Sequence, residues 1–255
     1  MNKRLMFSAA LVMALLSANA QKRAFTIEDL YRVKGLSSVS LSPDGKTVCY
    51  TASSSDLKSQ KSGSDIYIMN ADGSHTKALT EDGKSSSAVW SKDGKSIFFT
   101  NNEKGTAQIF RMDLTTCETE QVTDYELGIG SPVISPDERY IAFTAEVYPD
   151  LGADAKANKA RMEKKEQGPV QAHIADKLLY RHWTSYNDGR CNHLILFDTQ
   201  TKTYKDLTPG NYSLIFVVGG GITYQFSPDS KEICFVSNHD EHQELAPMPT
   251  CGRYL

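Results

Sequence analysis

The sequence predicts an all-β fold, a partial β-propeller of about four blades in which the last blade is incomplete. Three observations carry this prediction: a four-residue turn motif that occurs four times, a β-rich run after each copy, and a spacing of about 45 residues. A propeller blade is a four-stranded antiparallel unit of this length. The alternative all-β class, a sandwich, would favour strictly alternating strands and would not repeat one turn motif in register.

The turn motif is first seen as Ser-Pro-Asp-Gly at residues 42–45. The later copies are Ser91-Lys92-Asp93-Gly94, Ser135-Pro136-Asp137-Glu138 and Ser227-Pro228-Asp229-Ser230, at intervals of 49, 44 and 92 residues, the last being about two periods. Pro at the second place and Gly at the fourth are typical of a type I turn that ends in a left-handed residue. We expect the Asp to bond within its own turn. We expect the turns with Glu138 and Ser230 to be looser, because a side chain at positive φ costs about 1 kcal/mol.

Short apolar runs on either side of each motif predict the strands of each blade. First strands are expected at residues 39–41, 88–90, 132–134 and 224–226, and second strands at 48–51, 97–100, 141–144 and 233–236. Third strands are expected at 65–69, 108–112 and 193–197, and the fourth strands end in Leu79-Thr80, Val122-Thr123 and Leu207-Thr208. The second strands are apolar on both faces, as expected for a blade that lies between two others.

An insertion of about 45 residues, near 146–191, interrupts the third blade and accounts for the doubled interval. Residues 154–167 are rich in Ala, Lys and Glu and predict a solvated helix. Residues 170–183 have apolar side chains at helical spacing, among them Ile174 and Trp183, and are expected to pack on the propeller. Such an insertion either shapes access to a site at the rim or is a surface insertion without a functional role.

The N-terminal segment, residues 1–20, has the features of a secretory signal peptide. Lys3 and Arg4 precede an apolar run, and the segment ends in Ser-Ala-Asn-Ala at Ala20. We therefore expect a secreted or periplasmic protein that starts near Gln21. A helical lead-in is expected over 21–35, followed by the propeller over 36–245.

Composition excludes several classes of function. The 28 basic and 31 acidic residues give a net charge of -3, which does not favour nucleic-acid binding, and no apolar run reaches the roughly 18 residues of a membrane span. The five cysteines lack the spacing of a zinc site or a disulfide framework. We expect Cys49 and Cys234 to be buried in strands, and Cys191 with His193 to be ordinary strand residues. No metal and no cofactor are expected.

Two further stretches extend the pattern: residues 25–30, Phe-Thr-Ile-Glu-Asp-Leu, and Tyr180-Arg181-His182-Trp183 leading into Asn192-His193-Leu194. With them, residues 25 to about 244 resemble the N-terminal propeller of a secreted prolyl oligopeptidase family serine peptidase, of the dipeptidyl-peptidase and acylaminoacyl-peptidase branch. TolB-type propellers share the turn motif. The resemblance implies an α/β-hydrolase domain after the propeller, with a Ser, Asp and His triad, and a propeller that screens folded proteins from it.

The candidates for shaping a peptide entrance are Tyr180, Arg181, His182 and Trp183, with a core role for Trp183 as the alternative. No catalytic residue is expected. No serine has the flanking glycines of a Gly-x-Ser-x-Gly elbow, and none of the six histidines has a serine and an acid partner recognisable from sequence. The chain alone is therefore not expected to hydrolyse peptides.

Residues 246–255 contain two prolines and do not alternate like a strand, where the third strand of the fourth blade is due. Read one base out of register, their codons are compatible with Ser-Thr-Asn-Ala-Asp-Leu-Trp-Glu-Val, a stretch common at this place in the peptidase family. We therefore expect an out-of-frame tail without an evolved structural role. At the locus, restoring the frame should lead into further turn motifs and a hydrolase domain.

Two functions stay open at this stage. The first is a non-catalytic propeller fragment of a secreted serine peptidase that acts on short peptides, in which the propeller gates access and peptides are cleaved by the missing catalytic domain. The second is a free-standing periplasmic TolB-like propeller that binds protein or peptide partners. The sequence leaves the oligomeric state open.

Overall fold

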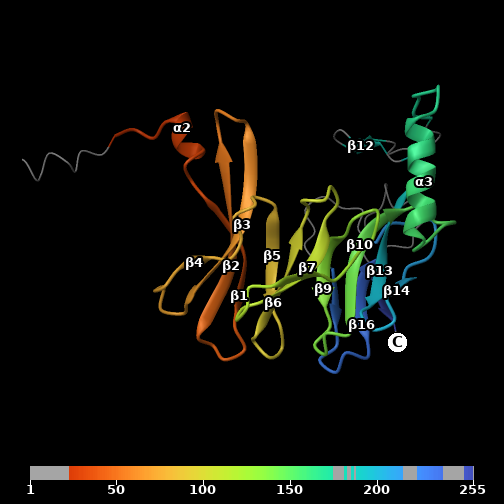
Figure 1. Cartoon of the computed structure of the whole chain (residues 1–255). Coiled ribbons are helices and arrows are strands. Elements are labelled where there is room, and N and C mark those ends of the chain that lie inside the picture. Colours follow the sequence, from red (N-terminus) through yellow and green to blue (C-terminus); the bar gives the residue numbers. More distant parts are fainter. Residues whose placement is uncertain are drawn as a thin grey trace, which may run out of the picture.

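The computed structural model describes residues 23–174, 181–182, 185–186, 188–214, 223–237 and 250–254, and in these ranges the chain forms successive antiparallel sheets (Figure 1). Blade 1 contains β1 (Gly35–Leu41), β2 (Thr47–Asp56), β3 (Lys61–Asn70) and β4 (Lys77–Ala78), and blade 2 contains β5 (Ser85–Trp90), β6 (Ser96–Asn101), β7 (Gln108–Asp113) and β8 (Thr119–Gln121). Blade 3 contains β9 (Gly130–Ile134), β10 (Tyr140–Val147), β13 (Cys191–Asp198) and β14 (Thr203–Asp206). Blade 4 contains β15 (Tyr224–Phe226), β16 (Ile233–Ser237) and β17 (Thr250–Tyr254). The predicted fold class, an all-β partial propeller, is confirmed.

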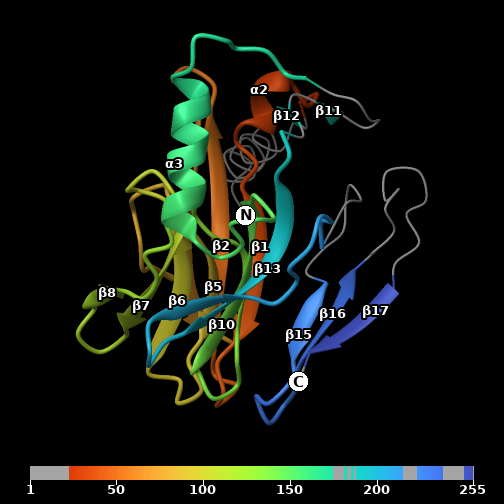
Figure 2. The same cartoon turned by 90° about the vertical axis from the view of Figure 1, so that its right-hand side faces the viewer.

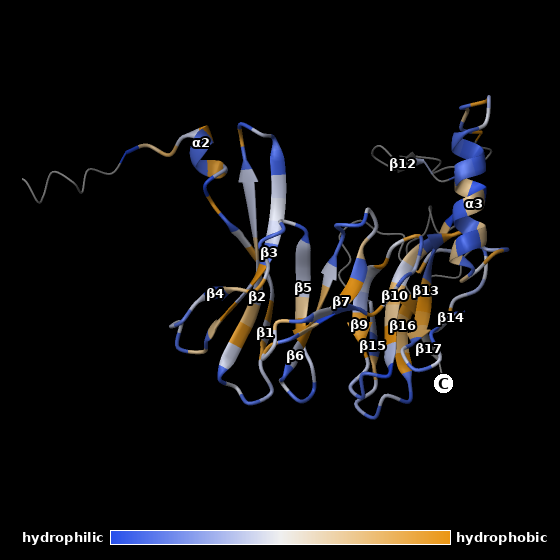
Figure 3. Ribbon diagram, viewed as in Figure 1, coloured by the Kyte–Doolittle hydropathy of each residue, from blue (hydrophilic) through white to orange (hydrophobic). Residues whose placement is uncertain are grey.

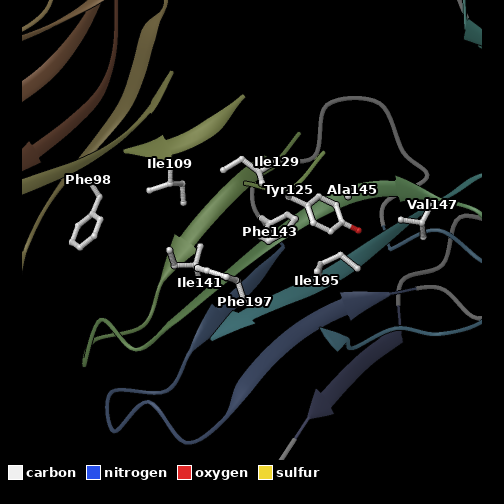
Figure 4. Packing of buried hydrophobic residues seen from close by; sticks show 10 residues of the cluster. All are labelled: Phe98, Ile109, Tyr125, Ile129, Ile141, Phe143, Ala145, Val147, Ile195 and Phe197. Atoms are coloured by element: carbon white, nitrogen blue, oxygen red, sulfur yellow. The ribbon is translucent and has the colours of Figure 1, made fainter. Parts of the chain in front are cut away.

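Three apolar clusters join the four blades in chain order. Between blades 1 and 2 the cluster contains Cys49, Ile66, Ala88, Ile97, Phe99 and Met112. Between blades 2 and 3 it includes Phe98, Ile109, Ile141, Phe143 and Phe197 (Figure 4). Between blades 3 and 4 it includes Ala142, Leu194, Leu207, Tyr224, Phe226 and Phe235. The apolar residues lie on the strands and the polar ones on the turns and the insertion (Figure 3).

A strand between two blades is buried on both faces. All six residues of β6 are buried, as is the run from Ile141 to Ala145 in β10, which confirms the prediction for the second strands of blades 2 and 3. In blades 1 and 4 the second strands are buried mainly on one face. In the described ranges no blade covers the other face of blade 1, and Leu36 and Val39 are 68% and 69% exposed. Cys49 is buried as predicted, but the prediction for Cys234 is wrong: it is exposed, because Ile233 and Phe235 point toward blade 3 and Cys234 points away.

The four turn motifs adopt one geometry. In the third copy the Ser135 hydroxyl donates to Asp137 Oδ1 at 2.6 Å, Asp137 Oδ1 also accepts from the Arg139 N–H at 3.1 Å, and Ser135 Oγ accepts from the Tyr140 N–H at 2.9 Å. The other three copies repeat these bonds. The Asp of each motif therefore acts within its own turn, as predicted.

The expectation that two of the turns are looser is wrong. Glu138 and Ser230 have φ of 62°, close to the 72° of Gly45 and 68° of Gly94, and all four turns close with the same backbone bond of 2.8–3.0 Å. The replacing side chains have partners that a glycine would lack. Glu138 Oε1 accepts from the Lys92 N–H of blade 2, and Ser230 Oγ accepts from the Asp137 N–H of blade 3 at 3.0 Å. These bonds between blades offset the cost of positive φ.

Two helices lie outside the blades, and one strand of blade 4 comes from the C-terminal segment. In the predicted lead-in, α2 (Ile27–Leu30) has a capping box between Thr26 and Asp29, and Arg23 donates to the same carboxylate. In the insertion, α3 (Ala155–Glu166) lies within the predicted helix at 154–167. At the other end, β17 pairs with β16 in the third-strand position of blade 4, in the segment for which we expected no structural role.

The turn network gives a direct test of the local role of its aspartate. Asp137→Ala is expected to lower the free energy of unfolding by about 1 kcal/mol, because the Ser135 hydroxyl and the Arg139 N–H lose their shared acceptor. Asp137→Asn keeps an acceptor oxygen and is expected to lose less than half as much. Chemical denaturation of the three proteins measures both effects, and an Asp137→Ala protein as stable as the parent would contradict the assignment.

Candidate functional site

Helix α3 stands at the end of the blades opposite to the turn motifs, which we call the rim (Figures 1 and 2). The helix begins after Asp154, whose side chain accepts from the Ala157 N–H at 2.9 Å. Its one buried residue is Asn158, which accepts from the Tyr148 N–H at 2.6 Å and donates to the Gly152 carbonyl at 3.1 Å. Asn158 therefore fixes the base of the helix to the end of β10.

The rest of α3 is held by charge. Arg161 forms a bidentate pair with Asp150 at 2.7 and 2.8 Å. Lys159 lies 3.5 Å from Glu126, and Lys165 lies 3.0 Å from Asp188. Exposed pairs of this kind each contribute little free energy, about 0–1 kcal/mol. A helix that is polar on nearly all sides is typical of one that faces solvent or a further domain.

A groove of about 600 Å³ lies between α3 and the ends of blades 2 and 3. We call it the rim groove. Its floor is formed by small and apolar residues, among them Ala107, Leu127, Ile129 and Ala145, and Met162 reaches it from α3. Its volume falls within the range of small-molecule and peptide pockets, which are mostly apolar with a few charged groups.

The walls of the rim groove carry more negative than positive charge. Lys159 and Arg190 line it together with four glutamates, and both cations are already paired, Lys159 with Glu126 and Arg190 with Glu146 at 2.8 Å. The remaining two, Glu163 and Glu166, are three residues apart on one face of α3, and within the described ranges neither has an ion pair. The groove can therefore accept a cationic group beside an apolar one.

The second half of the insertion differs from the prediction. Residues 170–174 are not helical, Ile174 is 94% exposed, and residues 181–182 lie in a strand, so the predicted helix over 170–183 is wrong at these positions. Helix α3 ends before Gly168-Pro169, and a proline cannot continue a helix at that point. The apolar spacing alone did not show where the helix stopped.

The four predicted entrance residues are only partly described. Arg181 and His182 form β11 (Arg181–His182), which pairs with β12 (Ser185–Tyr186), and both strands lie at the rim (Figure 2). Tyr180 and Trp183 lie outside the described residues. The charged residues of the rim groove were missed as a set, although the i, i+3 spacing of Glu163 and Glu166 in the predicted helix was a signal for two of them.

A polar cluster ties the β11–β12 hairpin to the end of α3. The His173 ring stacks on the Tyr186 ring with centroids 3.7 Å apart, and His173 Nδ1 lies 2.8 Å from Asp188 Oδ1. Asp188 also forms an ion pair with Lys165. Burial raises the pKa of Asp188, but its bonds to His173 and Lys165 outweigh burial, so the pKa is lowered overall. These contacts connect Tyr186 of β12 and the adjoining Asp188 to the C-terminal end of α3.

His193 is fully buried and both of its ring nitrogens are bonded. Nδ1 lies 2.7 Å from Asp206 Oδ2, and Nε2 lies 2.9 Å from the Gly210 carbonyl. Burial lowers the pKa of His193, but the bonds to Asp206 and Cys191 outweigh it and raise the pKa to about 9. This acid partner, 13 residues away on a neighbouring strand, was not predicted from the sequence.

The described residues contain no group of three or more metal-ligating side chains, and no described helix is long and apolar enough to cross a bilayer. In the described part of the chain, His173 bonds to Asp188, and His193 bonds to Asp206, Cys191 and the Gly210 carbonyl; none of these bonds is to a serine hydroxyl. What this part of the molecule offers is a binding groove.

Comparison with known proteins places the chain among peptidase propellers and TolB. It is 29% identical over 207 residues to dipeptidyl-peptidase 5 of Porphyromonas gingivalis, covering 79% of this chain and 29% of that peptidase. It is 25% identical over 228 residues to the uncharacterized peptidase YuxL of Bacillus subtilis, covering 88% of this chain and 33% of that protein. The chain thus spans about a third or less of the length of these relatives.

Among solved structures, the acylaminoacyl peptidase of Pyrococcus horikoshii shares the fold with a TM-score of 0.59 and 19% identity, over 86% of this chain and 30% of that one. The model of the TolB β-propeller domain, PD40, matches residues 20–167, which is more than half of the chain. With its repeated turns and stacked four-stranded blades, the chain belongs to the TolB-like β-propeller family.

Proposed function

We propose that this chain is the propeller part of a secreted peptidase that acts on short peptides, and that the rim groove binds peptide on its way to a hydrolase domain outside these 255 residues. The observation that carries the proposal is the composition of the groove, an apolar floor beside two glutamates that have no ion pair among the described residues. The peptidase names of the matched relatives support the substrate class.

The chemistry of the groove suits one kind of ligand. Glu163 and Glu166 on α3 attract a cationic group, such as the free amine of a peptide, while Met162 and Ile129 give an apolar surface to a side chain. A volume of about 600 Å³ accommodates a few residues and not a folded domain. The proposed discrimination against large substrates is therefore steric.

In this proposal the insertion provides the gate. Helix α3 projects from the rim, and the β11–β12 hairpin is tied to its end through His173, Tyr186 and Asp188. Together they narrow the approach to the groove from the side of the rim. Arg181 and His182 lie on this hairpin, which keeps them, with Tyr180 and Trp183, as candidates for shaping the entrance. Secretion, through residues 1–20, is part of the same proposal.

Calorimetric titration of the full chain with the peptide Ala-Leu-Ala and with its N-acetylated form tests the groove directly. The free-amine peptide is expected to bind more tightly than the acetylated one. The double substitution Glu163→Gln and Glu166→Gln is expected to weaken binding of the free-amine peptide by about fivefold, because two exposed charges are lost. The affinity for the acetylated peptide is expected to stay unchanged.

The matched control is Glu118→Gln with Glu120→Gln, which removes the same charge at exposed positions near β8, away from the groove. It is expected to leave both affinities unchanged. Equal weakening in the control, or a groove variant that binds both peptides as the parent does, would contradict the proposed site.

A further inference from the structure

The first three blades end in a joint of the same design. A polar residue of the third strand, Asp65, Gln108 or His193, stands 15 residues before the threonine that ends the blade, Thr80, Thr123 or Thr208. In each joint the threonine Oγ1 accepts from the backbone N–H of the residue after the polar one, at 3.0, 2.9 and 2.9 Å. We call the place of Asp65, Gln108 and His193 the clamp position.

In blades 1 and 2 the clamp residue binds the loop that leads to the next blade. Asp65 Oδ1 accepts from the Gly83 N–H at 3.0 Å. Gln108 Oε1 accepts from the Tyr125 N–H at 3.0 Å, and its Nε2 donates to the Tyr125 carbonyl at 2.7 Å. Two different side chains thus perform one task at equivalent places in the repeat.

In blade 3 the clamp residue is His193, and each of its two ring nitrogens lies against an acceptor oxygen. Asp206 Oδ2 lies 2.7 Å from Nδ1, and the Gly210 carbonyl lies 2.9 Å from Nε2. A carboxylate and a carbonyl cannot donate, so both ring nitrogens must carry a proton. With Asp206 as a carboxylate, the geometry therefore fits the imidazolium form, a buried cation paired with Asp206.

The loop that His193 holds connects blade 3 to blade 4. Leu207 and Leu214, at its two ends, belong to the apolar cluster between these blades. Between them the chain turns back on β13, where the Leu214 N–H donates to the Asn192 carbonyl at 2.7 Å. The ring of Tyr212 lies against Gly210, where an added Cβ would come within 2.5 Å of Cε1. Leu207 and Leu214 therefore join this loop to the packing between blades 3 and 4.

We propose that His193 makes the attachment of blade 4 to blade 3 dependent on pH between pH 7 and pH 10, and that the joints held by Asp65 and Gln108 lack this dependence. Loss of the imidazolium proton leaves one ring nitrogen with a lone pair directed at the Gly210 carbonyl or at Asp206. One of the two bonds is then lost and replaced by repulsion between two acceptors. The loop over residues 207–214 opens as a result.

The direction of the effect follows from the groups that face His193. These are Asp206 from β14, Cys191 from β13 and, in the loop, Tyr212, whose ring centroid is 6.3 Å away. Tyr125, on the side of blade 2, is also close enough to respond to the charge of Asp206. The pKa values of Tyr125 and Tyr212 are both raised, mainly by burial and secondly by the negative charge of Asp206.

The pKa of His193 is raised from 6.5 to about 9 in the closed joint. A group with a raised pKa stabilises the closed state fully below the pKa of the open state and loses this contribution as the pH rises through the higher pKa. The closed joint is therefore expected to weaken between pH 7 and pH 10. With these two values, the opening constant of the loop rises on the order of 70-fold over that range.

Hydrogen exchange of the full chain, corrected for the intrinsic rate at each pH, measures the opening of each joint. The loop at 207–214 is expected to open on the order of 70-fold more at pH 10 than at pH 7, while the loops held by Asp65 and Gln108 change little. His193→Gln gives blade 3 the same clamp residue as blade 2, a glutamine, and is expected to abolish the pH dependence of loop opening. Cys191→Ser, which removes the neighbouring thiol, is expected to retain it.

Equal opening of loop 207–214 at pH 7 and pH 10 would overturn the proposal, as would a His193→Gln protein with the pH dependence of the parent. Should His193→Gln fail to fold, the nitrogen chemical shifts of the His193 ring in the unaltered protein decide the matter. Two protonated nitrogens at pH 7 support the proposal, and a neutral ring at pH 7 overturns it.

Discussion

Burial of each blade's apolar face against the next blade is the interaction on which the rest of this structure depends. The three apolar clusters each lie between two blades, and among the described residues no further cluster lies within a single blade. In such a repeat, stability is a sum of neighbour contacts. The rim groove exists because blades 2 and 3 are stacked, and α3 has its place because Asn158 binds the end of β10 in that stack.

Around this packing the repeat keeps a fixed polar framework and varies a few positions within it. The bonds of Ser and Asp in the turns are the same in all four copies, while the fourth place is Gly, Glu or Ser. The side chains of Glu138 and Ser230 each accept a hydrogen bond from a backbone N–H of the preceding blade. The clamp position varies in the same way, and the residue chosen there decides how the joint responds to pH.

The repeat made most of the fold predictable, because turn residues at fixed places and apolar runs between them have one local interpretation. The polar helix at 154–167 was predictable from composition. The helix expected over 170–183 was wrong at residues 170–174 and 181–182, since apolar spacing in a short segment does not separate a helix from irregular chain or a short strand. The pairs of Arg190 with Glu146 and His193 with Asp206 join residues on different segments, which only the folded register brings together.

The central claim, that neighbours stabilise each blade, is tested most directly by amide hydrogen exchange of the strands at a single pH near 7. The strands β6 and β10, each with a blade on both sides, are expected to be the most protected. The second strand of blade 1, with one face uncovered in the described structure, and the strands of blade 4 are expected to exchange faster. Equal protection of β2, β6, β10 and β16 would show that each blade is stable by itself and would contradict this account.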